Sequence, residues 1–291
     1  MCGVDSFFDA PLQFIDVGEV ALRVRTAGQG SAVVLLHGHP RTHTTWYRVA
    51  PRLAEQHTVV CPDLRGYGGS TAPATREDHS QASKRAMAQD VVSLMRQLGH
   101  GRFAVVGHDR GSYVAQRLAL DHPEVVTHLC NLDSVPIGEV LARADAGFAQ
   151  RWWHWFFLGQ TVKPAERLIN ADPDAWYKVD PAGMGSENYA DLHAAIHNPT
   201  VVHSMCEDYR AGLGVDRAAD DADRSAGRRI TCPVLMLWAT GDDMVDLYGD
   251  PLAVWKHWAD NVTGYGIDSG HHMAEEAPDQ LVSALDRFLP R

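Results

Sequence analysis

A five-residue segment, Gly107-His108-Asp109-Arg110-Gly111, has the pattern of a nucleophile held at a sharp turn. An apolar run precedes it and a helical pattern follows it, so the turn would join a buried strand to a helix. Two glycines permit close packing of that strand and helix and leave the Asp109 side chain exposed. A carboxylate nucleophile attacks a saturated carbon and forms an ester with the substrate. The alternative is that Asp109 only caps the helix.

Two further segments contain groups that such a nucleophile needs. His37-Gly38-His39-Pro40 follows an apolar run, and the backbone N–H groups of His39 and Arg110 would form an oxyanion hole. Near the C-terminus, Ser269-Gly270-His271-His272 offers His271 as a general base. The chain order of nucleophile, acid and histidine is that of α/β-hydrolases.

The acid that orients the histidine has two candidates. Asp133 directly follows one strand pattern, and Asp242 follows the next one along the chain. A carboxylate in either place would hold the imidazole in its working tautomer. We favour Asp133 and keep Asp242 as the alternative.

The elements that must position these residues alternate between strands and helices. The pattern predicts an α/β fold, with a mostly parallel sheet flanked by helices on both faces. A hairpin is expected over residues 12–26, and helices are expected at 85–98, 111–121, 252–258 and from 278 onwards. Buried strands are expected at 32–36, 59–61, 103–106, 125–132 and 234–238.

The alternation breaks between residues 137 and 229, where aromatic residues are frequent and no comparable strand run occurs. We expect a hydrolase core in two parts, 1–136 and 230–291, with a helical cap at 137–229. Ligands of open α/β sheets bind beyond the carboxyl ends of the strands. The cap leaves the core after Asp133, at such an end, so it should cover the site.

Composition narrows the class of partner. The 291 residues include 26 Lys or Arg and 37 Asp or Glu, a formal charge of −11, which disfavours nucleic acid and anionic membranes. The apolar runs are too short to cross a bilayer, and the Met1 to Asp5 segment lacks a signal-peptide pattern. Five cysteines without a C-x-x-C pair indicate reduced thiols in a cytoplasmic protein. The histidines form no ligand-spaced cluster, so we expect neither a metal nor an organic cofactor. The expected partner is a small-molecule substrate.

Segments along nearly the whole chain resemble one family. They are His37 to Pro40 with Thr42, His43 and Trp46; Asp63 to Gly68; Gly107 to Gly111; Leu132-Asp133; Trp153-His154-Trp155; Cys206 to Gly212; and Gly270-His271 with Glu275 to Pro278. The chain resembles the haloacetate dehalogenases, a group of α/β-hydrolases that includes fluoroacetate dehalogenases. The Gly107 to Gly111 segment alone is also shared with epoxide hydrolases and haloalkane dehalogenases.

The resemblance implies a hydrolytic dehalogenase of small 2-haloacids. Asp109 would form the alkyl-enzyme ester, and water activated by His271 would hydrolyse it. His154 and Trp155 would bind the leaving halide, and Arg110 would pair with the substrate carboxylate. The family also implies a homodimer.

The chain departs from the family at two places in the expected pocket. Tyr113 stands where the family usually has a second arginine, and Arg41 is a candidate to replace that charge. Gly214 stands near the position of a tyrosine that completes the halide pocket in fluoroacetate-active members. Loss of one halide donor matters most for fluoride, the poorest leaving group, so we expect fluoroacetate to be a poor substrate.

Two other functions remain open from the sequence. An epoxide hydrolase uses the same Asp–His–acid set, with tyrosines that protonate the epoxide oxygen, and the candidates are Tyr113, Tyr177, Tyr189 and Tyr209. A non-catalytic ligand-binding protein on this fold is the second alternative, because a fold alone does not establish activity.

Overall fold

The computed structural model describes residues 6–290 of the chain. The segment Met1 to Asp5, which includes Cys2 and in which we expect no signal peptide, lies outside the described residues. Cys61, Cys130, Cys206 and Cys232 are free thiols. Over residues 6–290, no helix has the length and apolar character needed to cross a membrane.

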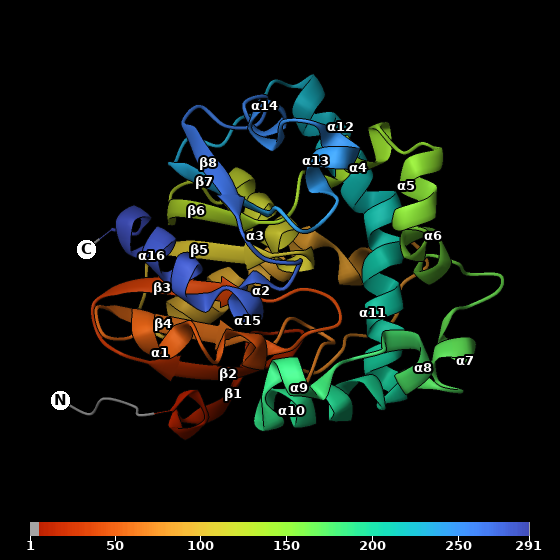
Figure 1. Ribbon diagram of the computed structural model, residues 1–291, viewed down its shortest axis with the longest axis horizontal. Coiled ribbons are helices and arrows are strands. Elements are labelled where there is room, and N and C mark those ends of the chain that lie inside the picture. Colours follow the sequence, from red (N-terminus) through yellow and green to blue (C-terminus); the bar gives the residue numbers. More distant parts are fainter. Residues whose placement is uncertain (1–5, 291) are drawn as a thin grey trace.

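One sheet forms the centre of the described chain (Figure 1). Its eight strands follow the order β1-β2-β4-β3-β5-β6-β7-β8. β2 pairs antiparallel with β1 and β4, whereas all other neighbours pair in parallel. The strands are β1 (Leu12–Asp16), β2 (Ala21–Ala27), β3 (Ser31–Leu36), β4 (His57–Pro62), β5 (Phe103–His108), β6 (Val126–Leu132), β7 (Val234–Ala239) and β8 (Val262–Ile267).

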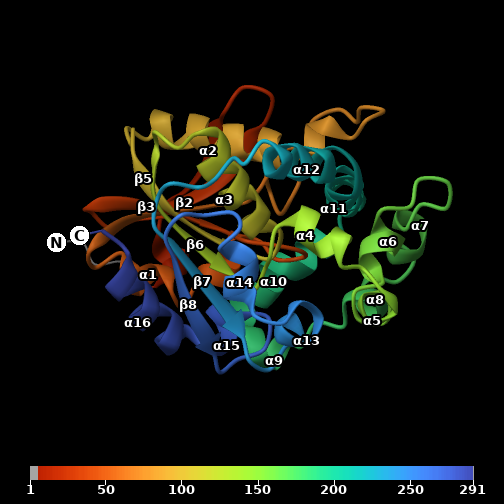
Figure 2. The same cartoon turned by 90° about the horizontal axis from the view of Figure 1, so that it is seen from above.

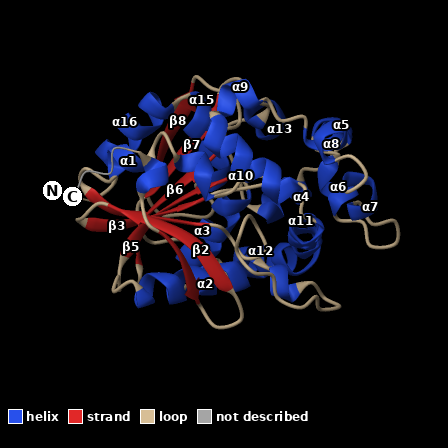
Figure 3. Cartoon of the chain, turned by 90° about the horizontal axis from the view of Figure 1, so that it is seen from below, coloured by secondary structure: helices blue, strands red, loops and turns tan. Residues whose placement is uncertain are grey.

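Helices cover both faces of this sheet, as Figures 2 and 3 show. α2 and α3 lie on one face, and α1 and α16 lie on the other. The core helices are α1 (Ala50–Leu53), α2 (Lys84–Gln97), α3 (Arg110–Asp121), α13 (Met244–Tyr248), α14 (Pro251–Trp255), α15 (Met273–Glu276) and α16 (Pro278–Phe288). Three short 3-10 helices are η1 (Phe7–Asp9), η2 (His43–Trp46) and η3 (Ser80–Ala82).

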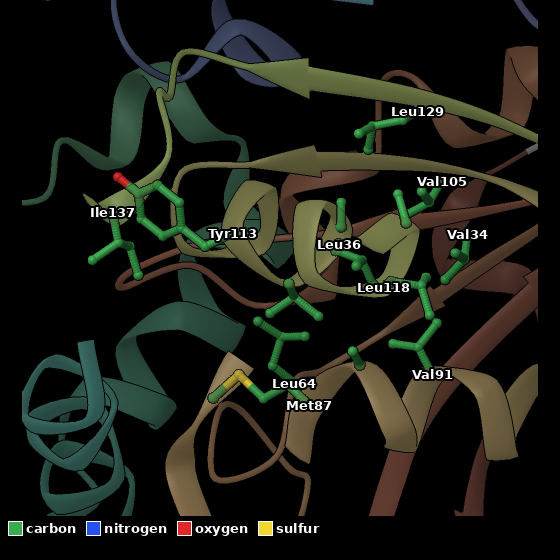
Figure 4. Packing of buried hydrophobic residues seen from close by; sticks show 14 of the residues in the cluster. Val34, Leu36, Leu64, Met87, Val91, Val105, Tyr113, Leu118, Leu129 and Ile137 are labelled. Atoms are coloured by element: carbon green, nitrogen blue, oxygen red, sulfur yellow. The ribbon is translucent and has the colours of Figure 1, made fainter. Parts of the chain in front are cut away.

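The continuous apolar run of β3 arises because both of its faces are buried. Alternate side chains of a strand point to opposite faces. Val34 and Leu36 pack with α2 and α3 in one cluster, part of which is drawn in Figure 4, whereas Val33 and Leu35 join the cluster on the α16 face. These packed layers fix the carboxyl ends of β3, β5, β6 and β7, where the candidate site residues begin.

A helical segment, here called the helical insertion, separates β6 from β7. It comprises α4 (Ile137–Ala142), α5 (Ala146–Arg151), α6 (His154–Leu158), α7 (Glu166–Ile169), α8 (Pro173–Tyr177), α9 (Pro181–Met184), α10 (Ser186–Ile196), α11 (Pro199–Ala211), the π-helical η4 (Gly212–Asp216) and α12 (Arg217–Ser225). In Figure 1, most of it lies on the side of the sheet where β5 ends and α3 begins.

The predicted alternation of strands and helices is confirmed, although the short helices α1, α13 and α15 were not predicted. Another difference concerns residues 252–258. The helix there, α14, ends at Trp255, and Trp258 lies in a turn. The following residue, Ala259, forms a β-bridge with Ile230, which requires the chain to leave the helix. The buried Trp258 indole instead donates a hydrogen bond to Glu139.

Candidate active site

Asp109 stands at a strained turn between β5 and α3. Its backbone has φ 51° and ψ −120°, a conformation that residues other than glycine rarely adopt. The flanking glycines are required by close approach: a Cβ on Gly107 would lie 2.4 Å from the Gly111 oxygen, and one on Gly111 would lie 2.4 Å from the Leu36 oxygen. This packing presents the Asp109 carboxylate at the start of α3.

The loop after β3 meets this carboxylate. The backbone N–H of His39 donates a hydrogen bond of 2.7 Å to Asp109 Oδ1. Gly38 is essential to this approach, because a Cβ there would lie 2.3 Å from the same oxygen and 2.8 Å from the Arg110 nitrogen. The two predicted oxyanion-hole amides, of His39 and Arg110, therefore border one side of the carboxylate.

His271 lies on the other side, in the loop between β8 and α15. Its Nε2 is 3.8 Å from Asp109 Oδ2, and its Nδ1 is 2.7 Å from Asp133 Oδ2 and 3.1 Å from Asp242 Oδ2. His108 fixes the loop, because its Nε2 is 2.7 Å from the His271 carbonyl oxygen and donates to it. Both acids left open by the sequence thus face the same ring nitrogen.

The two acids have different environments. Burial raises the pKa of Asp133 to about 6, and its Oδ1 accepts a hydrogen bond from the Ala239 N–H. Asp242 is half-exposed, and the hydrogen bond with His271 holds its pKa well below its usual range. Burial opposes ionisation of Asp109, but His271 and nearby cations lower the pKa of this carboxylate strongly. The carboxyl group of Asp109 is therefore ionised at neutral pH.

A cavity of about 280 Å³, here called the inner cavity, opens onto Asp109 and His271. His154 and Trp155 on α6, which are predicted to bind the leaving halide, line this cavity. Tyr209 on α11 lines it as well. Burial lowers the pKa of His154 to about 4, so the ring is neutral and has one N–H to donate. The complete lining is His39, Asp109, Arg151, Trp152, His154, Trp155, Tyr209, Asp242, Asp243, His271 and His272.

A second cavity of about 600 Å³, here called the outer cavity, adjoins the first and shares His39, His154 and His272 with it. Its walls include α8 and the Pro40-Arg41 segment. Tyr177 lines this cavity, and its hydroxyl donates to the Met205 sulfur at 3.4 Å. Tyr189 lines neither cavity.

Arg110, the residue predicted to pair with a substrate carboxylate, lies against the buried acid Asp208. The Arg110 side chain is fully buried and is not part of the inner-cavity lining. Nη2 donates to Asp208 Oδ1 at 2.7 Å, and Nε donates to Oδ2 at 3.2 Å. The guanidinium also lies over the Tyr209 ring, 4.2 Å from its centroid. Arg110 therefore forms a buried ion pair with Asp208, which Lys84 also contacts, and Arg110 Nη1 has no hydrogen-bond partner among the described residues.

The other predicted carboxylate-binding residues are also away from the inner cavity. Arg41 forms a bidentate pair with Glu275, at 2.9 and 3.0 Å, and borders only the outer cavity. Tyr113 is 3% exposed and packs in the core, where Figure 4 shows it beside Ile137. Gly214 lies in η4 and lines neither cavity.

Arg151 was not among the residues predicted for the site. This residue ends α5, lines the inner cavity, and forms an exposed ion pair of 3.2 Å with Asp246. It is the one arginine or lysine in the inner-cavity lining among residues 6–290.

Comparisons with known proteins agree with this architecture. A family model described as alpha/beta hydrolase fold matches residues 31–277. A fluoroacetate dehalogenase from Burkholderia sp is 39% identical over 285 residues, which cover 95% of this chain and 93% of that protein. A soluble epoxide hydrolase from Corynebacterium sp. (strain C12) is 34% identical over 91% of this chain and 92% of its own length.

A solved structure is similar throughout. ALR0039 from Nostoc sp PCC 7120, which is named as an alpha/beta hydrolase, matches with a TM-score of 0.93 and 40% sequence identity. The match covers 97% of this chain and 98% of that one. The likeness therefore includes both the sheet and the helical insertion.

Proposed function

The chain belongs to the α/β-hydrolase fold family, among proteins similar to haloacetate dehalogenases, and from this premise we propose that it hydrolyses the carbon–halide bond of small 2-haloacids. One observation carries the proposal: the Asp109 carboxylate faces a cavity in which His271 lies 3.8 Å away and aromatic N–H and O–H groups line the wall. A carboxylate nucleophile suits displacement at a saturated carbon.

In the first step, Asp109 Oδ2 bonds to the carbon that carries the halogen, and the carbon–halogen bond breaks with its electron pair on the halide. Oδ1, which accepts from the His39 N–H, becomes the ester carbonyl oxygen. His154, Trp155 and Tyr209 are the donors available to the departing halide. Neutral donors suit this role, because they stabilise the charge only as it develops on the halide.

In the second step, water attacks Cγ of the Asp109 ester. His271 Nε2 accepts a proton from this water, and the charge that develops on Oδ1 is held by the backbone amides of His39 and Arg110. The tetrahedral intermediate then collapses as the bond between Cγ and the alkylated oxygen breaks. The departing alkoxide takes the proton from His271 Nε2 and leaves as a 2-hydroxy acid, and the Asp109 carboxyl group releases its remaining proton to water. Asp133 and Asp242 orient the imidazole and stabilise its protonated form.

We assign recognition of the substrate carboxylate to Arg151. Arg110 is occupied by Asp208, and Arg41 is occupied by Glu275. Arg151 lines the inner cavity, and its exposed partner Asp246 is readily exchanged for a substrate carboxylate. A planar guanidinium also matches two carboxylate oxygens.

A second candidate function is epoxide hydrolysis, which Tyr209 and His154 favour. Both line the inner cavity beside Asp109, and their ring centroids are 5.9 Å apart. A hydroxyl and an imidazole in this position would donate hydrogen bonds to an epoxide oxygen as its ring opens. An epoxide also needs no carboxylate site, which agrees with the engagement of Arg110 by Asp208.

A substrate panel distinguishes the two functions. We expect halide release from iodo-, bromo- and chloroacetate, a lower rate with fluoroacetate, and little diol from styrene oxide. Diol formation without halide release from any haloacetate would favour the epoxide hydrolase. Failure of both reactions would favour the non-catalytic alternative.

The same panel tests the carboxylate site. Replacement of Arg151 by Gln should raise KM for bromoacetate by about tenfold, the effect of losing one charge-assisted hydrogen bond. The rate with styrene oxide, if present, should not change. Arg96→Gln, at an exposed position on α2, is the matched control. An unchanged KM in Arg151→Gln would contradict this assignment.

A further inference from the structure

Three metal-ligating side chains meet on the surface of the helical insertion, away from both cavities. They are Asp174 on α8, His193 on α10, and His197, which directly follows α10. His197 Nε2 is 3.3 Å from Asp174 Oδ2, and His193 Nε2 is 3.8 Å from Asp174 Oδ1. One ligand atom of each residue lies within 4.8 Å of the others. The prediction that no histidines cluster at ligand spacing is therefore wrong here.

The helix explains why the two rings meet. Residues four apart lie on the same face of a helix, so His193 and His197 project side by side. Their rings stack with centroids 4.0 Å apart and an interplanar angle of 29°. Both Nε2 atoms consequently point toward the same carboxylate.

A hydrogen bond prepares His197 as a ligand. Its Nδ1 lies 2.8 Å from the His193 carbonyl oxygen. A carbonyl oxygen only accepts, so Nδ1 holds the hydrogen, and in the neutral ring Nε2 has the lone pair. Metal-ligating histidines characteristically donate the other N–H to a carbonyl or carboxylate, which fixes the tautomer and the ring orientation.

We propose that Asp174, His193 and His197 bind a divalent transition-metal ion of the Zn²⁺ class. Two ligand atoms on a tetrahedral zinc ion, at its usual bond lengths, lie roughly 3.4 Å apart, close to the separations found here. The side chains of His193, His197 and Asp174 are 42%, 34% and 63% exposed, which leaves further coordination positions open to water. A bound ion would link α8 to the C-terminal end of α10.

This link has a structural consequence for the outer cavity. Ala175, Trp176, Tyr177 and Lys178, which follow Asp174 directly, form part of its wall. An ion that ties Asp174 to α10 therefore restrains that wall without contacting the inner cavity. The proposal is independent of the function proposed above.

Zinc titration of EDTA-treated protein by calorimetry tests the proposal. We expect binding of Zn²⁺, with an affinity at least about tenfold lower in His193→Ala, His197→Ala and Asp174→Asn, because even loss of a supporting hydrogen bond costs that much. His257→Ala removes another exposed histidine and should leave the affinity unchanged. Thermal unfolding with Zn²⁺ provides a second measurement, since an ion that binds only the folded protein raises Tm.

The pattern among the variants is decisive. His108, His271 and His272 also lie close together, so Zn²⁺ held only there would bind the three variants and the wild type equally well. That result, or no binding in the wild type, would overturn the proposal. A zinc-induced rise in Tm that persists in His193→Ala and His197→Ala would overturn it as well.

Discussion

The imidazole of His271 lies between carboxylates, and one of them changes charge during the proposed reaction. Asp133 and Asp242 face Nδ1, and Asp109 faces Nε2. Burial disfavours the imidazolium, but these carboxylates raise the pKa of His271 well above its usual range. These carboxylates therefore favour the protonated form of the resting ring. Ester formation removes the charge of Asp109 and so lowers the pKa of His271 at the step that needs a base.

Replacement of His271 by Asn should separate the two steps. The first step needs only the Asp109 carboxylate, so one equivalent of halide should be released. The steady-state rate should fall by about 10²- to 10⁴-fold, the usual contribution of a general base. Mass spectrometry should show an adduct on Asp109, and Asp109→Asn should show neither adduct nor halide. Absence of the adduct in His271→Asn would count against the ester mechanism.

The two acids should substitute for each other in part. Asp133→Asn and Asp242→Asn each leave one carboxylate on Nδ1, so each should lower kcat less than the double variant, for which a loss of about 10⁴-fold is expected. Removal of either charge also lowers the pKa of His271, so the acidic limb of the kcat–pH profile should move to lower pH. If one single variant is as impaired as the double variant, one acid acts alone.

Among individual residues, the sequence predicted the positions of those that directly follow strands. It did not predict which residues pair with partners far away in the chain. Asp109, Asp133 and Asp242 each follow the end of a predicted strand, and parallel strands bring those ends to one edge of the sheet. The fate of Arg110 depends on Asp208, which lies 98 positions away on α11. The pattern of residues around Arg110 in the sequence cannot predict a partner so far away in the chain.

Among the elements, α11 connects the helical insertion to the core through two adjacent residues. Tyr209 lines the inner cavity, whereas Asp208 is fully buried and pairs with Arg110 on α3 and Lys84 on α2. The Tyr67 hydroxyl also donates to Asp208, at 2.8 Å. One carboxylate thus pairs with two buried cations from different core helices.

Replacement of Asp208 by Asn should therefore destabilise the protein. Loss of one partner from a buried pair leaves an uncompensated charge, which costs about 3–5 kcal/mol. Urea unfolding measures this difference. Asp221→Asn, which breaks an exposed pair with Arg217, should change stability by no more than about 0.5 kcal/mol. Equal effects in the two variants would show that burial of Asp208 does not govern its contribution.

The elements themselves were predictable where hydrophobic periodicity was strong. β3 and β5 are continuous apolar runs because helices cover both of their faces. The bounds of β8 were not predictable, because it alternates partly exposed residues with Gly264 and Gly266. Its position depends on parallel pairing with β7, which is a tertiary contact.

For the whole molecule, buried ion pairs predict sensitivity to acid. Burial opposes ionisation of Asp208 and Asp63, but Arg110 and Lys84 in the first case, and His43 and Arg23 in the second, hold the pKa of each well below its usual range. A depressed pKa in the folded state gives stability that is present above the unfolded value, near 3.9, and lost as pH falls.

Urea midpoints between pH 6 and pH 3 check this expectation. The wild type should lose stability as pH falls below about 5. Asp208→Asn should start from a lower midpoint and show a weaker dependence on pH, because one of the titrating carboxylates is gone. A pH dependence identical to that of the wild type would show that other carboxylates govern acid unfolding.

The junction between the two cavities lies beside the residues that face Asp109. His39, His154 and His272 border both spaces, so a ligand that approaches Asp109 from the α8 side meets these three residues. An alkyl chain too long for the inner cavity would extend into the outer cavity. For the proposed haloacid substrates, we therefore expect linear acids to react faster than branched acids of equal mass.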